Sequence, residues 1–387
     1  MKRYKLLNNV LGWAVFVIAA VTYILTLEST ASFWDCGEFI ASGYKLEVGH
    51  PPGNPIFMLT ARFFANFASS PSEVAYMVNL MSGLLSAATI LLLFWTITRL
   101  AQKIVLREGE TEETMSLGQM IAILGSGLVG ALAYAWSDTF WFSAVEGEVY
   151  AYSSFCTALV FWLILKWESV ADLPHANRYI ILIAYIIGVS IAVHLLNLLC
   201  IPAIVLVYYY RKYKNTDLKG SLIALLVSFV LIVLLLYGLV PGFVEVAGWV
   251  ELLFVNVFHL PFNSGVVFYF FLIVGVIAWA IYETYAQRSD KLIKISFLIS
   301  IVLVGIPFIG DGYIIGIILT AVLAYYLFTR KKLAVVAMNT ILLSLFVIFI
   351  GYSSYALIVI RSTANTPMDQ NSPEDISVSY THLRAHE

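Results

Sequence analysis

Two carboxylates stand three positions apart just after the first apolar segment of the chain. They are Asp35 and Glu38, within the run WDCGEFI. In a helix, residues with this spacing lie on one face. Two carboxylates held close share protons unequally, so one of them can stay basic near neutral pH. Such a pair suits the deprotonation of an incoming hydroxyl group. The alternative is a solvated turn in which Glu38 pairs with Lys45.

A rigid turn follows in the run VGHPPGNP, which ends at Pro55. Its prolines and glycines are incompatible with a helix and are typical of a tight turn. We predict that this turn presents the imidazole of His50 to a phosphate or an acid. A purely structural turn, with His50 only hydrogen-bonded, is the alternative. Arg62 either pairs with a lipid phosphate through two hydrogen bonds or reaches the membrane interface with its long side chain.

A second polar stretch, residues 136–150, brings three more acids beside aromatic side chains. The acids are Asp138, Glu146 and Glu148, and the stretch ends at Tyr150. Aromatic rings beside carboxylates are a common way to bind sugars. We therefore predict that these residues, together with Trp34 from the first stretch, bind a sugar or the molecule that accepts it. An aromatic belt at the membrane interface is the alternative interpretation.

A third polar feature lies between two short apolar segments, where His194 is followed by Asn197. Polar side chains at such a place are costly in a membrane and usually have a function. The three cysteines, Cys36, Cys156 and Cys200, lie far apart and show no metal-binding spacing. We expect them to be buried free thiols.

The elements that position these residues must be membrane helices, because the composition excludes a soluble fold. Of 387 residues, 61% are hydrophobic and 12% are charged, with a mean hydropathy of +0.88. Soluble domains carry about 25% charged residues. The net charge of −2 gives no sign of nucleic-acid binding. The sequence therefore predicts an all-α polytopic membrane protein.

The hydropathy pattern contains about eleven candidate spans, given that a membrane helix needs about 20 mostly apolar residues. The first is predicted to be a retained anchor, because no small-residue cleavage site precedes Glu28. The aromatic segment 241–265 is expected to form a helix in the membrane interface. The predicted spans are 10–27, 74–99, 118–136, 149–166, 179–194, 195–210, 221–240, 266–286, 292–309, 313–329 and 333–360.

Basic residues indicate the orientation of these spans. Cytoplasmic loops of membrane proteins are enriched in Lys and Arg. If the N-terminus is cytoplasmic, all but four of the 22 Lys and Arg residues fall on the inner side. Merging 179–210 into one span would move the basic clusters 288–294 and 330–332 outside, so two short spans are favoured there. The inner loops are short and basic, whereas the outer loops are acidic, and we expect the chemistry at the outer face. The four basic residues outside are Lys45, Arg62, Arg361 and Arg384.

Three motifs together resemble a known family. They are the run from WDCGEFI to VGHPPG, TFWFSAVEGEVY at 139–150, and HLLNLLCIP at 194–202. They resemble a bacterial membrane family long described only as a domain of unknown function. That family is similar to the eukaryotic transmembrane protein O-mannosyltransferases of the GT-C superfamily, and the resemblance covers most of residues 10–375. GT-C enzymes place an acidic residue in the first outer loop, and Asp35 and Glu38 match that placement.

The resemblance implies a GT-C-like helix bundle that moves a sugar, with mannose as the first candidate, from a polyprenyl-phosphate donor. The acceptor would be a hydroxyl group of a protein Ser or Thr, or of a glycan, on the non-cytoplasmic face. Asp35 would be the general base with Glu38 beside it. Stabilising the phosphate leaving group is usually the larger energetic term. The resemblance implies no particular cofactor. Whether the carboxylates hold a divalent metal is left open at this point. The implied phosphate-binding residues are His50, Arg62 and His194, and the implied sugar- or acceptor-binding residues are Trp34, Asp138, Glu146, Glu148 and Tyr150.

Two other functions compete with this one. A transporter or lipid flippase would place charged or unwound elements near the bilayer midplane, often in repeated halves. The sequence has no internal repeat, and its polar residues gather at one face. A structural membrane subunit would leave the acid-rich outer loops unexplained.

The expected organisation is a transmembrane domain at 1–360 and the start of a truncated extracytoplasmic region at 361–377. Residues 378–387 resemble an artefactual tail, so His382 and His386 are given no role. The expected location is a bacterial inner membrane with the active face in the periplasm. The expected partners are membrane lipid, the lipid-linked sugar and the acceptor.

Overall fold

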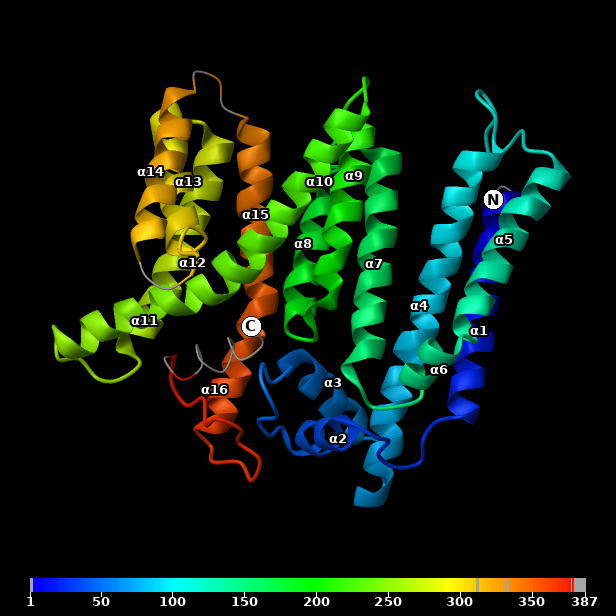
Figure 1. Cartoon of the computed structure of the whole chain (residues 1–387), viewed down its shortest axis with the longest axis horizontal. Coiled ribbons are helices and arrows are strands. Elements are labelled where there is room, and N and C mark those ends of the chain that lie inside the picture. The colour runs from blue at the N-terminus through cyan, green and yellow to red at the C-terminus, as the bar shows by residue number, and fades with distance from the viewer. Residues whose placement is uncertain (1–2, 311–312, 331, 333, 377, 379–387) are drawn as a thin grey trace. The chain divides into compact units, whose positions relative to one another are not determined.

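The computed structural model describes residues 3–310, 313–330, 332, 334–376 and 378. Within these residues the chain is helical and contains no β-strand, as Figure 1 shows. The chain divides into two compact units. The first comprises residues 1–49, 54–173 and 190–200, and the second comprises residues 50–53, 174–189 and 201–387.

The first unit contains helices α1 to α7, and the second contains α9 to α16 together with most of α8. The helices are α1 Arg3–Leu25, α2 Cys36–Lys45, α3 Pro55–Ala65, α4 Val74–Val105, α5 Leu117–Ala135, α6 Asp138–Ala144, α7 Val149–Val170, α8 Arg178–Ile191, α9 Ile201–Lys212, α10 Leu218–Val233, α11 Val240–Asn256, α12 Ser264–Ala286, α13 Asp290–Leu303, α14 Tyr313–Thr329, α15 Val335–Tyr352 and α16 Ala356–Ser362.

Eight helical stretches among the described residues are long and apolar enough to cross a membrane. This confirms the prediction of an all-α polytopic membrane protein. Each of the other three predicted spans coincides with a shorter helix. These are α8 and α13, with 14 residues each, and α14, with 17 residues, against the roughly 20 that a bilayer requires. The full count of eleven spans therefore stays a prediction.

Residues 179–210, where two short spans were favoured over one long span, form two helices as expected. Helix α8 ends at Ile191, a 3₁₀ turn covers Leu195–Cys200, and α9 begins at Ile201. Pro202 stands at the second position of α9, where its missing N–H group is tolerated. All three cysteines are free and buried, which confirms that expectation.

The predicted helix in segment 241–265 is present as α11, but it is continuous with α10. Together they form a helical stretch of 39 residues, Leu218–Asn256. One π-helical turn, Leu234–Leu239, joins the two helices. Pro241, just after this turn, cannot donate a backbone hydrogen bond, and a π turn is a common way to absorb such a break. Figure 1 shows α11 running obliquely to α12 and α15.

The first unit is built around the long helix α4, which packs against α1, α5 and α7. Its core is a cluster of buried side chains that includes Tyr23, Ile90 and Phe94. A second cluster attaches the outer-loop helices α2 and α3 to the start of α4. In that cluster Phe39 of α2 lies on Phe57 of α3, with their ring centroids 5.2 Å apart. This packing holds α2, and therefore the acidic motif at its start, against the membrane helices.

In the second unit, two glycines lie where α8 approaches α15 closely. A Cβ atom on Gly188 would lie 2.5 Å from the carbonyl oxygen of Ile348, and one on Gly351 would lie 2.4 Å from the backbone nitrogen of Val189. Small residues of this kind let membrane helices approach closely. The two glycines therefore set the distance between α8 and α15.

We expect Gly188→Val to destabilise the protein by about 1–3 kcal/mol or more, because its side chain would push against the backbone of α15. The matched control is Gly275→Val on α12, where a Cβ atom would meet nothing within 4 Å. Thermal unfolding of the purified variants in detergent measures the difference. Equal unfolding temperatures for the two variants would contradict the close packing of α8 and α15.

The predicted end of the transmembrane domain at residue 360 stays a prediction, as does the predicted end of the extracytoplasmic region at residue 377. The predicted artefactual tail, residues 378–387, lies outside the described residues except for Val378.

Candidate functional site

The acidic pair lies at the start of helix α2. Asp35 is the residue that caps the N-terminus of α2, and Glu38 stands in its first turn. Each presents a carboxylate oxygen within 4.8 Å of the other. Acidic residues are favoured at helix N-termini, where unpaired backbone N–H groups carry partial positive charge. The local fold therefore brings the two predicted catalytic carboxylates together.

The side chain of Asp35 is accessible. It makes no capping hydrogen bond to the helix, although its carbonyl oxygen accepts the first helical bond from the N–H of Phe39. The residue is exposed. Trp34 beside it is 88% exposed and has a φ angle of 60°. A bulky residue in this left-handed region is unusual, and strain of this kind is often found at functional sites. An acceptor molecule can therefore reach Asp35 beside an exposed indole ring.

Two more predicted acids lie in the short loop between α6 and α7. Glu146 and Glu148 are 3% and 4% exposed, respectively. Glu148 caps the N-terminus of α7, where one carboxylate oxygen accepts a hydrogen bond of 3.2 Å from the N–H of Val149. The loop is tied to the segment after α1, because the N–H of Glu28 donates to the carbonyl oxygen of Val145 at 3.2 Å.

The burial of these two carboxyl groups changes their proton affinity. Burial raises the pKa of Glu148 to about 7, and the negative charges of Glu146 and Asp35 add to this, while the hydrogen bond from Val149 opposes it. Burial also raises the pKa of Glu146, with the charge of Glu28 adding and a hydrogen bond with Ser32 opposing it. Glu148 thus interacts electrostatically with Asp35, so the two polar stretches of the sequence meet at one site.

Asn79 of α4 is a part of the site that the sequence analysis missed. It is fully buried, and its side-chain amide donates to the carbonyl oxygens of Glu28, at 2.8 Å, and Thr30, at 3.1 Å. Its side-chain oxygen lies against Gly147, on which a Cβ atom would be 3.0 Å away. Asn79 therefore joins α4 to both acidic segments. A single Asn within an otherwise apolar span was the available signal.

Two buried acceptor atoms in this region have no hydrogen-bond partner. They are the side-chain oxygen of Asn79 and the Oε2 atom of Glu146. A buried acceptor without a partner is costly. Both atoms are closed to solvent and lie in or against the segments that hold the acidic residues.

The predicted phosphate-binding residues have different surroundings. Arg62 of α3 donates from Nη1 to the carbonyl oxygen of Tyr44 at 2.5 Å, and its guanidinium group lies over the Tyr44 ring. The turn that contains His50 is grouped with the second unit. The link between His50 and this site is the peptide chain, because His50 directly follows Gly49. A Cβ atom on Gly49 would lie 2.7 Å from Oε1 of Glu38.

The remaining predicted residues lie on neighbouring elements. The ring of His194 lies 5.5 Å from that of Tyr150 at the start of α7, and its Nδ1 atom accepts a hydrogen bond from the N–H of Leu196. Asn197 is fully buried, and both polar atoms of its side chain have no hydrogen-bond partner. Asp138 is exposed in the first turn of α6.

Fold and site together define an all-α polytopic membrane protein in which an acidic cluster lies in the loops beside the membrane helices of its first unit. A comparison with protein families matches residues 35–217 to the family described as "Protein O-mannosyl-transferase TMEM260 N-terminal domain". This range contains every predicted site residue except Trp34. No solved structure matches the chain significantly.

The curated proteins that are similar to the chain include two O-mannosyl-transferases. Protein O-mannosyl-transferase TMEM260 of Mus musculus is 27% identical over 210 residues, which is 54% of this chain and 27% of that protein. Protein O-mannosyl-transferase tmem260 of Dictyostelium discoideum is 23% identical over 190 residues, which is 47% of this chain and 21% of that protein. The matches thus span about a quarter of these relatives. They confirm the predicted resemblance to eukaryotic O-mannosyltransferases.

Proposed function

We propose that the chain is a GT-C-type glycosyltransferase. It transfers a sugar, with mannose as the first candidate, from a polyprenyl-phosphate donor to a hydroxyl group of a protein Ser or Thr at the non-cytoplasmic face. The observation that carries the proposal is the acidic cluster itself. An exposed Asp35 interacts there with a buried Glu148, whose pKa is raised to about 7. The names of the similar proteins support the choice of sugar and acceptor.

In this mechanism Asp35 accepts the proton of the acceptor hydroxyl while the hydroxyl oxygen attacks the anomeric carbon of the sugar. The bond from that carbon to the phosphate oxygen breaks, polyprenyl phosphate leaves, and the anomeric configuration inverts. Glu148 is buried beside this base and interacts with it electrostatically. Trp34, which is exposed beside Asp35, contributes to the binding of the sugar or the acceptor.

The phosphate leaving group needs positive charge or hydrogen-bond donors. We assign this role to His50, Arg62 and His194. If a divalent cation contributes, Asp35 and Glu38 supply the carboxylate oxygens that such ions prefer. Activity assays with and without a chelator then distinguish a metal-assisted reaction from one that depends on protein cations alone.

A transporter or flippase is the competing function, and a liposome experiment separates the two. The protein is reconstituted with radiolabelled polyprenyl-phosphate mannose and a serine-containing peptide. A transferase consumes the lipid and moves the label to the peptide, whereas a flippase changes the leaflet of the lipid and leaves it intact. Movement of intact lipid without any labelled peptide would favour the flippase.

The orientation is a further prediction and follows from the distribution of Lys and Arg. We expect the outer loop at Ser70 and the inner loop at Asn215 to lie on opposite sides of the membrane. Single cysteines at these two positions, in a cysteine-free background, are labelled with a membrane-impermeant reagent in intact cells. Ser70→Cys should react and Asn215→Cys should not. Labelling of both from the same side would refute the predicted topology.

A further inference from the structure

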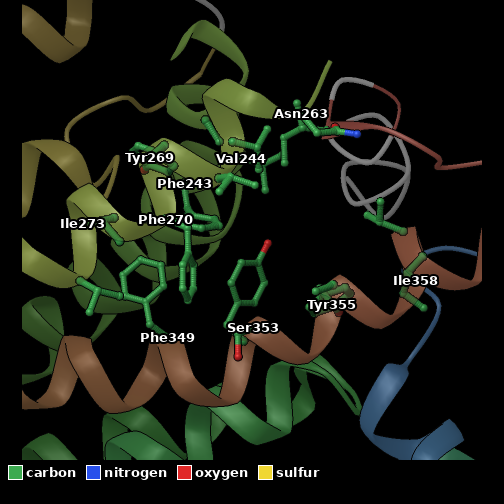
Figure 2. A pocket seen from close by; sticks show the side chains of 18 of the residues that line it. Phe243, Val244, Asn263, Tyr269, Phe270, Ile273, Phe349, Ser353, Tyr355 and Ile358 are labelled. Carbon is green, nitrogen blue, oxygen red and sulfur yellow. The ribbon is translucent and has the colours of Figure 1, made fainter. Parts of the chain in front are cut away.

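The second unit contains a cavity that the proposed reaction does not use. Its volume is about 740 Å³, and its walls come from α11, α12, α15, α16 and the segment that follows α16. The lining is mainly aromatic and aliphatic, as Figure 2 shows. Prominent lining residues are Phe243, Tyr269, Phe270, Ile273, Phe346 and Phe349.

The cavity extends along α12. On α12 its lining runs from Asn263, the residue before the helix, to Ile277. A helix rises 1.5 Å per residue, so this wall is about 21 Å long. A single extended hydrocarbon chain can lie along a wall of this length, and we refer to the cavity below as the slot.

The two ends of the slot differ in polarity. Asn263, at the start of α12, and Ser353, just after α15, lie toward one end, while Ile273 and Ile277 lie deeper along α12. Figure 2 shows Asn263 and Ile273 well apart along the cavity. Stretches of the chain that include α12 and α15 are long and apolar enough to cross a membrane. The slot therefore has the polarity of an amphiphile, with an apolar length and a polar mouth.

The charge at the mouth selects among amphiphiles. Glu374 is the one charged residue among the described residues that line the cavity, and it is exposed. Among the described residues the lining holds a carboxylate and no Lys, Arg or His, and such a lining is unsuited to a bare phosphate head group. It suits a head group that carries an ammonium ion, because an opposite charge at the rim favours binding.

We propose that this cavity binds one acyl chain of a phosphatidylethanolamine molecule from the surrounding membrane, with its ammonium group facing Glu374. The site is separate from the acidic cluster and does not depend on the proposed transferase activity. Its lipid would hold α12, α15 and α16 together by filling the space between them.

Crosslinking in lipid nanodiscs tests this site. The probe is phosphatidylethanolamine with a photoactivatable diazirine on one acyl chain, and crosslinked peptides are identified by mass spectrometry. We expect labelling on the lining residues of α12 and α15. Val274→Trp should lower it by about fivefold or more, because an indole ring fills the middle of the slot. The matched control is Val276→Trp, since Val276 is equally half-buried on the same helix but does not line the cavity.

Glu374→Gln tests the head group without changing a buried residue. It should lower labelling by phosphatidylethanolamine about two- to fivefold, the range of an exposed ion pair. It should leave labelling by a matched phosphatidylglycerol probe unchanged. Size-exclusion profiles show whether each variant is folded, and if Val274→Trp is not, the Glu374→Gln comparison decides alone.

Three results would overturn the proposal. One is equal labelling in Val274→Trp and Val276→Trp. Another is equal labelling of the wild type by the phosphatidylethanolamine and phosphatidylglycerol probes. The third is displacement of the probe by polyprenyl phosphate, which would assign the cavity to the proposed donor instead.

Discussion

Asp35→Asn is expected to lower sugar transfer by about 10²–10⁴-fold, the usual contribution of one positioned general base. The amide has nearly the same shape as the carboxylate but cannot accept a proton at neutral pH. Asp35 is exposed and makes no capping hydrogen bond, so the substitution should leave the fold of α2 intact. Donor binding should therefore be nearly unchanged. Turnover by the purified variant and its affinity for the polyprenyl-phosphate sugar are the two measurements.

Two comparison variants sharpen this result. Glu38→Gln should reduce turnover less, because on this mechanism Glu38 positions and tunes Asp35. Asp290→Asn changes an exposed acid in the first turn of another helix, α13, and should behave like the wild type. Turnover of Asp35→Asn at the wild-type rate would end the general-base assignment. Loss of donor binding in that variant would make Asp35 a ligand of the donor or of a metal.

Glu148→Gln is expected to make the protein more stable at alkaline pH and less active. Burial raises the pKa of Glu148 from 4.5 to about 7 in the folded state. The folded state therefore holds this proton more tightly than the unfolded state. The resulting stabilisation is fully present below pH 4.5 and is lost as the pH rises through 7. The total change is about 3 kcal/mol.

A glutamine at position 148 cannot ionise, so the variant should not lose this stability. Between pH 5 and pH 8 the wild type should lose about 2.5 kcal/mol more than the variant. Turnover should fall, because the substitution removes a carboxylate that interacts with the proposed base Asp35. Unfolding temperatures across this pH range, together with the transfer rate at pH 7, measure both effects. Glu108→Gln, on an exposed loop, is the control, and parallel pH profiles for the wild type and Glu148→Gln would refute the buried carboxyl assignment.

Most of the membrane helices could be predicted because their apolar segments are long and bounded by charged or turn residues. The break between α8 and α9 was also predictable, since the basic clusters later in the chain require it. The continuity of α10 with α11 was not, because Pro241 is typical of a helix boundary, whereas here a π-helical turn joins the two helices just before it.

Part of the candidate site was also visible in the sequence. The spacing of Asp35 and Glu38 predicts their common face if the segment is helical. The distinct role of Glu148 could not be predicted, since its proton affinity depends on burial at the start of α7 beside Asp35. Asn79 was missed because its partners are backbone carbonyl groups about fifty residues away along the chain.

The most direct test of the central claim is the mass of an acceptor peptide after incubation with the folded wild-type chain and polyprenyl-phosphate mannose. We predict that a serine-containing peptide gains one hexose on its hydroxyl group, that the same peptide with alanine gains none, and that Asp35→Asn forms product at least about a hundredfold more slowly. Binding of the intact donor with no hexose on any hydroxyl-bearing acceptor, or product formation that is independent of Asp35, would contradict the account.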